Sequence, residues 1–295
     1  MKLINFCLAL SHRLIDLLLR AKFKVQRVQI TLSQKSSGQS KSIESDSQAL
    51  GYEAQVSNLI SDDFLLRRFR RNFGYRMILE HVSYRQGLDY QKRITQLGVV
   101  SDSSIIELAM DDTFGDPRRY YYKEIGWISP TLLRYVSVYS EIESFIGLKN
   151  VNSIVEIGIG YGGQARVISK LGGVNNYKFY DLKDVQTLAL TFLARTCPQF
   201  LPGCLDIDNV EPGTFDLVIS NYAISELPID VQEEYLEKVI GTSAHCYLIM
   251  NSGASNKTGR SSGKLPQDAF LKALPGSSIH PEIPLTGPDN YVLIR

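Results

Sequence analysis

The sequence predicts an α/β fold in which helices cover a mostly parallel sheet, with a helical region in front of it. A buried strand, Ile154–Ile157, ends in glycines and turns into a helix from Gln164. Short apolar segments then alternate with helical ones, as in βαβ units, at 177–180, 203–208, 215–220 and 246–250. At the C-terminal end, a Gly-Pro-Asp turn lies between two apolar segments and is typical of a closing hairpin.

The segments between these strands carry helix signals. A helix is expected at 164–171, which two glycines terminate, and another at 185–195, which ends before Pro198. A third is expected from Pro228 to Val239. Proline is common at the first position of a helix, and the polar residues of 232–238 would form its solvent-exposed face. The hairpin is expected to pair 283–285 with 291–294.

The glycine turn is the most informative motif. Gly158 and Gly160 let the backbone take positive φ and approach a ligand, and the N–H groups at the helix start suit a polar or negative group. With Gly163 they also match the dinucleotide pattern G-x-G-x-x-G, and a turn that binds no ligand is the structural alternative. Glu156 argues against a pyrophosphate at this strand end. A carboxylate there suits a cofactor with an ammonium group, such as S-adenosylmethionine (SAM).

Polar residues also follow the other strands. Asp181 ends the second strand, where an acid accepts hydrogen bonds from the ribose of either NAD or SAM. Asp206 follows the third strand, where it would meet an adenine amino group or lie in a solvated turn. Ser220 and Asn221 end the fourth strand. Ligands of open α/β sheets bind at the point where the strand order reverses, so we expect the ends of the first and fourth strands to form one crevice.

Taken in this order, the motifs resemble those of the Rossmann-like class I SAM-dependent methyltransferases, whose sheet has seven strands and a C-terminal antiparallel hairpin. More narrowly, the chain is similar to a family of sugar O-methyltransferases from bacterial polysaccharide and glycan gene clusters. The matching segments lie between Phe114 and the C-terminus, at 129–135, 156–164, 180–182, 220–227 and 290–293. Ile159 departs from the pattern, because the family is expected to have a glycine there.

The resemblance implies SAM as cofactor and a sugar or sugar conjugate as acceptor, in polysaccharide or glycan biosynthesis. The cofactor-binding residues that we expect are Glu156, Gly158, Gly160, Gly162, Asp181, Asp206, Ser220 and Asn221. Three alternatives remain at this point: a methyltransferase for another small molecule or a protein, a non-catalytic SAM- or nucleotide-binding module, and an NAD oxidoreductase.

Methyl transfer to a hydroxyl needs alignment with the sulfonium and a base for the proton. Glu226 is the first candidate for the base because it lies just past the fourth strand, and His280 is the second because we expect it in the loop before the hairpin. Glu226 could instead stabilise the N-terminus of the following helix. A metal could replace the base, with oxygens from Asp206, Asp208 and Glu226, but their spacing does not require one, and no metal site is predicted.

Composition indicates a cytoplasmic enzyme. The chain has 295 residues, of which 44% are hydrophobic and 21% charged, enough for a full core and an accessory region. Its formal charge of +1 gives no basic field for nucleic acid. The four cysteines have no C-x-x-C spacing, which favours reduced thiols over disulfides or zinc. The sequence gives no oligomeric state.

Four regions are expected: an amphipathic helix at 1–32, a Ser- and Gln-rich linker at 33–50, a helical accessory or substrate region at 51–128 and the catalytic domain at 129–295. The first helix packs on the protein, or its residues 1–24 touch a membrane surface peripherally through basic side chains. In the accessory region Phe64, Leu65, Phe69, Phe73 and Met77 are expected to form one apolar helix face. The arginines of 67–71 would then either line a solvent-exposed helix face or bind a phosphorylated sugar.

Overall fold

The computed structural model describes residues 51–174, 176–251 and 265–295, together with Ile4, Cys7, Leu8, Leu10, Ser11 and Leu14. These six N-terminal positions are helical, and Leu8 packs partly against the main core. The rest of the expected N-terminal helix and membrane-contact segment, and the whole linker at 33–50, lie outside the described residues. Within the described part of the chain, no helix is long and apolar enough to cross a membrane.

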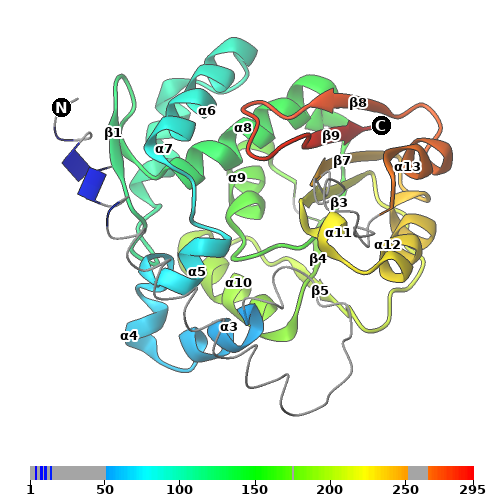
Figure 1. Cartoon of the computed structure of the whole chain (residues 1–295), viewed down its shortest axis with the longest axis horizontal. Coiled ribbons are helices and arrows are strands. Elements are labelled where there is room, and N and C mark those ends of the chain that lie inside the picture. The colour runs from blue at the N-terminus through cyan, green and yellow to red at the C-terminus, as the bar shows by residue number, and fades with distance from the viewer. Residues whose placement is uncertain are drawn as a thin grey trace.

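A seven-stranded sheet forms the centre of the protein, in the order β5-β4-β3-β6-β7-β9-β8 (Figure 1). Its strands are β3 (Ser153–Ile157), β4 (Asn176–Tyr180), β5 (Gly203–Leu205), β6 (Leu217–Asn221), β7 (His245–Met250), β8 (Ser278–Pro281) and β9 (Tyr291–Ile294). The first five are parallel, whereas β9 is antiparallel to both β7 and β8. The strand order reverses between β3 and β6. This confirms the predicted α/β fold with a Rossmann-like class I methyltransferase sheet.

Helices cover both faces of this sheet. One face packs against α8 (Pro130–Phe145), α9 (Gly163–Gly172) and α10 (Lys183–Thr196). The other packs against α12 (Ile229–Tyr235), the π-helical turn η3 (Leu236–Ile240) and α13 (Gln267–Ala273). Adjacent residues of a strand point to opposite faces, so Ile154 lies in the first core and Val155 in the second.

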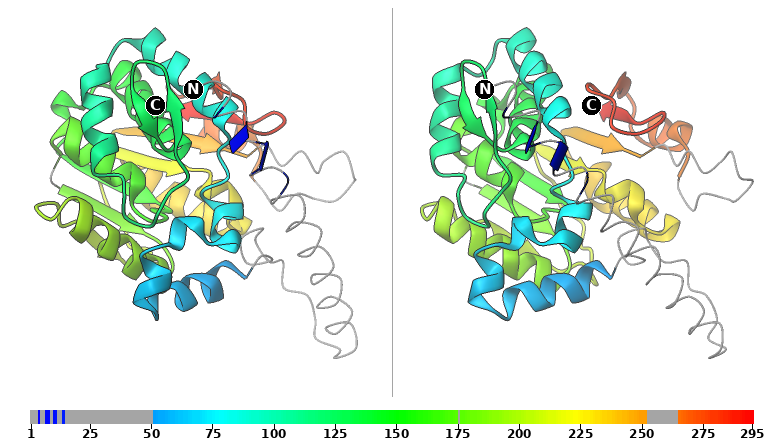
Figure 2. Two further views of the ribbon diagram at one scale, coloured as in Figure 1. Left: turned by 90° about the vertical axis from the view of Figure 1, so that its left-hand side faces the viewer. Right: turned by 60° about the vertical axis from the view of Figure 1, so that its left-hand side comes forward.

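The region before residue 130 forms a layer over the face with α8, α9 and α10 (Figure 2). Its elements are α3 (Tyr52–Ile60), α4 (Asp63–Leu66), η1 (Phe69–Arg71), α5 (Phe73–Ile78), α6 (Tyr84–Leu97), α7 (Asp102–Met110) and the hairpin β1 (Tyr120–Tyr122) with β2 (Gly126–Ile128). Helix α3 packs along α10, and α6 packs along α8. The prediction of a helical accessory region is confirmed, except for the small hairpin that it did not include.

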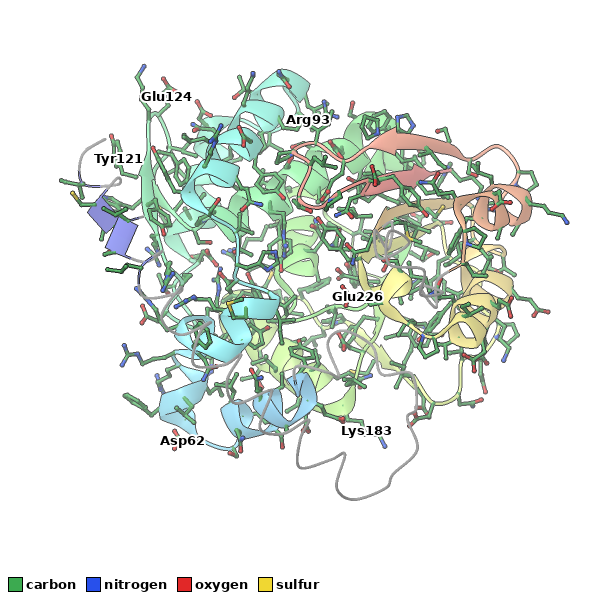
Figure 3. The ribbon with its side chains drawn as sticks, viewed as in Figure 1. Asp62, Arg93, Tyr121, Glu124, Lys183 and Glu226 are labelled. Atoms are coloured by element: carbon green, nitrogen blue, oxygen red, sulfur yellow. The ribbon has the colours of Figure 1, made fainter. Side chains whose placement is uncertain are left out.

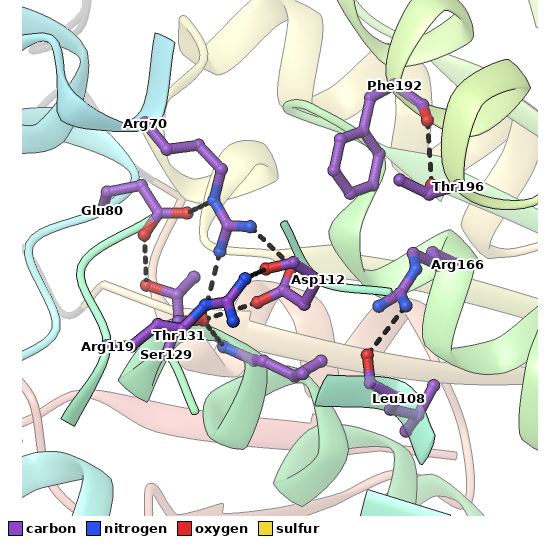
Figure 4. A network of polar contacts seen from close by, with 11 residues as sticks. Arg70, Glu80, Leu108, Asp112, Arg119, Ser129, Thr131, Arg166, Phe192 and Thr196 are labelled. Carbon is purple, nitrogen blue, oxygen red and sulfur yellow. Dashed lines mark hydrogen bonds and ion pairs between the residues drawn. The ribbon is translucent and has the colours of Figure 1, made fainter. Parts of the chain in front are cut away.

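A buried polar network joins this layer to the start of helix α8 (Figure 4). The guanidinium of Arg70, 0% exposed, pairs with Glu80 at 2.5 Å and Asp112 at 2.6 Å. Ser129, the N-cap of α8, donates to Asp112, and Thr131 donates to Glu80. Arg70 is therefore neither on a solvated face nor free to hold a phosphorylated sugar, unlike the expectation for the arginine run.

The predicted apolar helix face is also wrong. The chain breaks between α4 and α5, and Asn72 caps a new helix by accepting the N–H of Tyr75. The spacing from Phe64 to Met77 therefore does not describe one helix. Phe69 is fully buried, but Phe64 is 64% exposed.

The strand boundaries differ most from the expectation at β8 and β5, and β6 begins at Leu217 instead of residue 215. The first hairpin strand is Ser278–Pro281 instead of 283–285, because Pro284 has no N–H for the ladder and the Glu282 carboxylate accepts the N–H of Thr286 in a turn. Strand β5 ends at Leu205, since the Asp206 side chain accepts the N–H of Asp208 and starts a turn.

Candidate functional site

The glycine turn lies between β3 and α9, at the point where the strand order reverses. Gly158, Gly160 and Gly162 have φ angles of +82°, +57° and +89°, which residues with a side chain rarely adopt. A Cβ at Gly158 would also lie 2.2 Å from the Cβ of Ala223, just after β6. The turn is therefore pressed against the end of the neighbouring strand, as expected for one crevice.

Asp181 follows β4 and holds the turn from the side. Its carboxylate accepts the N–H of Gly160 at 2.9 Å and that of Leu182 at 2.8 Å. Burial raises the pKa of Asp181 to about 7, although both backbone hydrogen bonds lower it. The acid expected to meet a ribose therefore already orders the glycine turn, and each of its oxygens has a further lone pair for a ligand.

Glu156 lies inside β3 rather than beyond it. It is 1% exposed, and its Oε2 accepts a 2.7 Å hydrogen bond from the hydroxyl of Tyr177 on β4. Burial raises the pKa of Glu156 to about 8; the Tyr177 bond lowers it and the nearby Asp181 charge raises it. The carboxyl groups of Glu156 and Asp181 are therefore close enough to interact, and both favour binding a proton or another cation.

Ser220 and Asn221 end β6, next to the glycine turn. The hydroxyl of Ser220 donates to the carbonyl of Ile157 and accepts the N–H of Ile224, so this side chain joins the ends of β3 and β6. Asn221 is different: its Oδ1 is buried and has no hydrogen-bond partner among the described residues. A buried acceptor without a donor is costly, and a ligand N–H would satisfy it.

Glu226 ends the short helix α11 (Ala223–Glu226) and lies near the middle of the view in Figure 3. Its Oε1 accepts from the side-chain amide of Asn251, directly after β7. The N–H of Asn251 in turn donates to the hydroxyl of Ser225. The acid is therefore fixed between the ends of two adjacent strands, on the crevice side of the sheet.

The N-terminal layer reaches this crevice, which the sequence did not indicate. Tyr52 of α3 is buried, and its raised pKa comes first from burial and then from the charge of Asp181, with a weaker contribution from Glu226. The side chain of Leu79, just after α5, lies 3.1 Å from where a Cβ at Gly160 would be. No local signal marks these two residues, because their positions depend on how separate helices pack.

Two predicted residues lie further from the turn. Asp206 is exposed after β5 and orders the turn at Asp208. His280 is in strand β8 and not in a loop; its ring lies 5.0 Å from that of Phe145, and Ser278 is its hydrogen-bond partner. In the sheet register His280 lies level with Val292, Ile249 and Asn221, but on the outermost strand, four strands away from β3.

The residues at the crevice fit SAM. The unpaired Asn221 oxygen can accept from an ammonium or adenine amino group. Glu156, once it loses its proton, can balance the ammonium charge of the cofactor, and Asp181 can accept from its ribose hydroxyls. The positive-φ glycines have no side chains that would occupy the same space. Among the described residues, no group of three or more His, Cys, Asp or Glu side chains could hold a metal ion.

No family model matches the sequence, and no curated protein matches it either. Among solved structures, the chain is similar to an O-methyltransferase family protein from Burkholderia thailandensis, with 12% identity, a TM-score of 0.38 and alignment over 55% of this chain and 61% of that one. It is also similar to mitomycin 7-O-methyltransferase, with 14% identity, a TM-score of 0.37 and coverage of 55% and 56%. The methyltransferase domain of a bacterial Hen1 protein gives 12% identity, a TM-score of 0.41 and coverage of 55% and 95%. Similarity at this level assigns neither an activity nor a substrate to this chain.

Proposed function

We propose that this protein is a SAM-dependent O-methyltransferase that methylates a sugar hydroxyl. The observation that carries the proposal is the crevice itself: a glycine turn at the reversal point of the sheet, bordered by two buried acids and by the unpaired oxygen of Asn221. This combination suits a cationic nucleoside better than a pyrophosphate. The sugar acceptor is supported by the motif resemblance described above.

Each side chain then has a role. Gly158, Gly160 and Gly162 allow the backbone to approach the cofactor, while Asp181 binds the ribose and Asn221 accepts from an amino group. Glu156 balances the ammonium charge from inside β3. Ser220 joins the strand ends, and Asp206 lies beyond β5, on the side proposed for the adenine.

When bound, SAM supplies a methyl group that its sulfonium has already activated. The protein must hold the acceptor hydroxyl in line with that methyl and remove its proton. Glu226 is suited to the second task, because it is a carboxylate that Asn251 holds at the end of β6, on the crevice side of the sheet. The helical layer with Tyr52 and Leu79 excludes water from the same space.

The test is a thermal-shift comparison of SAM, S-adenosylhomocysteine and NAD⁺ on the full chain, followed by transfer of a labelled methyl group from SAM to a panel of bacterial glycans. SAM and S-adenosylhomocysteine should raise the melting temperature, and the label should appear in a sugar. Stabilisation by NAD⁺ alone would refute the cofactor, and label only in proteins or non-sugar metabolites would refute the acceptor.

A further inference from the structure

Arg134 is a buried cation in helix α8 that the proposed function has not used. Its side chain is only 7% exposed. It lies one turn into α8, within the segment Leu132–Val136, where every other residue is apolar or aromatic and buried.

The charge of Arg134 has no carboxylate within ion-pair distance in the described ranges. Its neighbours are instead the hydroxyl-bearing rings of Tyr90, Tyr135 and Tyr222; the guanidinium carbon lies 5.2 Å from the ring centroid of Tyr135. Burial raises the pKa of each of these tyrosines, so they stay neutral near pH 7 and do not balance the charge.

Two other arginines nearby are paired: the fully buried Arg70 has Glu80 and Asp112, and the partly buried Arg93 on α6 has Glu141 at 2.7 Å. Arg166 is also buried without an ion pair in the described ranges, but it donates to the carbonyl of Leu108. Burying a guanidinium without a counter-charge costs several kcal/mol, and arginine does not lose its proton to avoid that cost. Glu282, a carboxylate that contacts Tyr222, forms no ion pair with Arg134 in the described ranges; it accepts instead from Tyr222 and from both the N–H and the hydroxyl of Thr286.

Arg134 lies beside the crevice formed by the glycine turn and the end of β6. Tyr222 directly follows Asn221 at the end of β6 and has a φ of +72°. On the other side, Tyr135 packs against Gly163 at the start of α9, and its carbonyl accepts from Gln164. The arginine thus lies between the end of the glycine turn and the end of β6.

We propose that Arg134 binds an oxyanion, a carboxylate or phosphate group, of a molecule that occupies this crevice. The inference rests on the proposed function, which supplies two sources of such a group: the α-carboxylate of SAM itself, or an acidic group on the sugar acceptor. A planar guanidinium binds either group through two parallel hydrogen bonds, and this pairing is strongest where water is excluded.

The first measurement compares SAM with decarboxylated SAM, which lacks only the carboxylate, by calorimetry on the wild-type chain and on Arg134→Gln and Arg134→Lys. If Arg134 binds the cofactor, the wild type should prefer SAM by about 10- to 100-fold, and Arg134→Gln should lose this preference while still binding decarboxylated SAM. The ratio of SAM to decarboxylated SAM affinity in the wild type tests the proposal even if Arg134→Gln does not fold. Arg134→Lys should show a ratio between those of the wild type and Arg134→Gln.

The second measurement titrates inorganic phosphate into the wild type and Arg134→Gln, with and without S-adenosylhomocysteine. If the anion belongs to the acceptor, the SAM preference should be absent, and phosphate should bind the wild type at least about 10-fold more tightly than the variant. Arg93→Gln is the matched control, because it removes a paired arginine from the same interface and should change neither ratio.

Equal binding of SAM and decarboxylated SAM, together with equal phosphate binding by wild type and variant, would overturn the proposal. Failure of every SAM analogue to bind would instead refute the proposed function, and phosphate binding to the ligand-free protein would still report on Arg134.

Discussion

The guanidinium of Arg70 lies over the ring of Tyr161, with its central carbon 4.9 Å from the ring centroid. Tyr161 stands between Gly160 and Gly162, and Arg70 belongs to the N-terminal layer, so this contact joins the accessory region to the glycine turn. Tyr161 is also buried against Phe69 and Phe192. The accessory region therefore contacts the glycine turn directly and helps to shape the crevice.

Replacing Arg70 should be severely destabilising. Arg70→Ala leaves Glu80 and Asp112 buried without their cation, which typically costs about 3–5 kcal/mol. Urea unfolding of the variant would measure this loss. The matched control is Arg67→Ala in the same arginine run, whose partner Asp63 is exposed; it should change the free energy of unfolding by less than about 1 kcal/mol. Equal losses for the two variants would contradict the buried network.

Gly160→Val should abolish SAM and S-adenosylhomocysteine binding. The backbone has a φ of +57° there, and the new side chain would meet Leu79 in the crevice. Strain alone could unfold the variant, so the control is Gly173→Val, which has a φ of +67° but open space around its Cβ. Both should lose stability, and only Gly160→Val should lose calorimetric SAM binding at a temperature where both are folded. Unchanged affinity in folded Gly160→Val would show that the turn does not contact the cofactor.

The strands could be predicted because their signal is local. Apolar segments such as 217–221 and 245–250 each begin a few residues after a glycine, and the parallel core buries them on both faces. The first hairpin strand could not, because Ser278–Pro281 has no alternating apolar pattern and pairs only as an edge strand.

The part of the site that depends on chain order could also be predicted. The glycine turn, Asp181 and Asn221 lie at the same edge of the sheet because each ends or directly follows a parallel strand. The role of Arg70 depends on carboxylates 10 and 42 residues away, so nothing in the run of four arginines tells which one is buried. The isolated charge of Arg134 in an apolar helix segment is visible in the sequence, but only the structure shows that it has no carboxylate partner among the described residues.

Glu156→Gln should stabilise the ligand-free protein more as the pH rises. The pKa of Glu156 is raised from 4.5 to about 8 in the folded state, so the folded protein holds a proton that the unfolded chain has lost. The contribution of Glu156 to stability is therefore greatest below about pH 4.5 and falls as the pH rises to about 8. Glutamine does not titrate, and its carbonyl can still accept from Tyr177.

The measurement is the melting temperature of wild type and Glu156→Gln at pH 6 and pH 9. The difference, variant minus wild type, should increase by at least about 2–4 °C, which corresponds to roughly 1 kcal/mol in a protein of this size. Asp181 titrates in both proteins and cancels to first order. A difference that stays constant between the two pH values would mean that the Glu156 pKa is not raised.

Glu226→Gln should lower turnover by about 10²-fold or more and leave the affinity for S-adenosylhomocysteine nearly unchanged. Glutamine keeps the shape and the hydrogen bond from Asn251 but cannot take the acceptor proton, and loss of a general base costs about this much. Labelled methyl transfer to the glycan acceptor measures the first quantity, and calorimetry the second. Asp230→Asn, an exposed acid in the first turn of α12, is the matched control and should keep full turnover.

His280→Ala separates the two candidate bases. His280 packs against Phe145 in the edge strand β8, so its replacement should have little effect on the rate if Glu226 is the base. Full activity in Glu226→Gln together with loss in His280→Ala would assign the base to His280. If both variants keep full turnover and a chelator abolishes it, the hydroxyl is activated by a metal ion, and Glu226 instead serves to hold Asn251 at the end of β7.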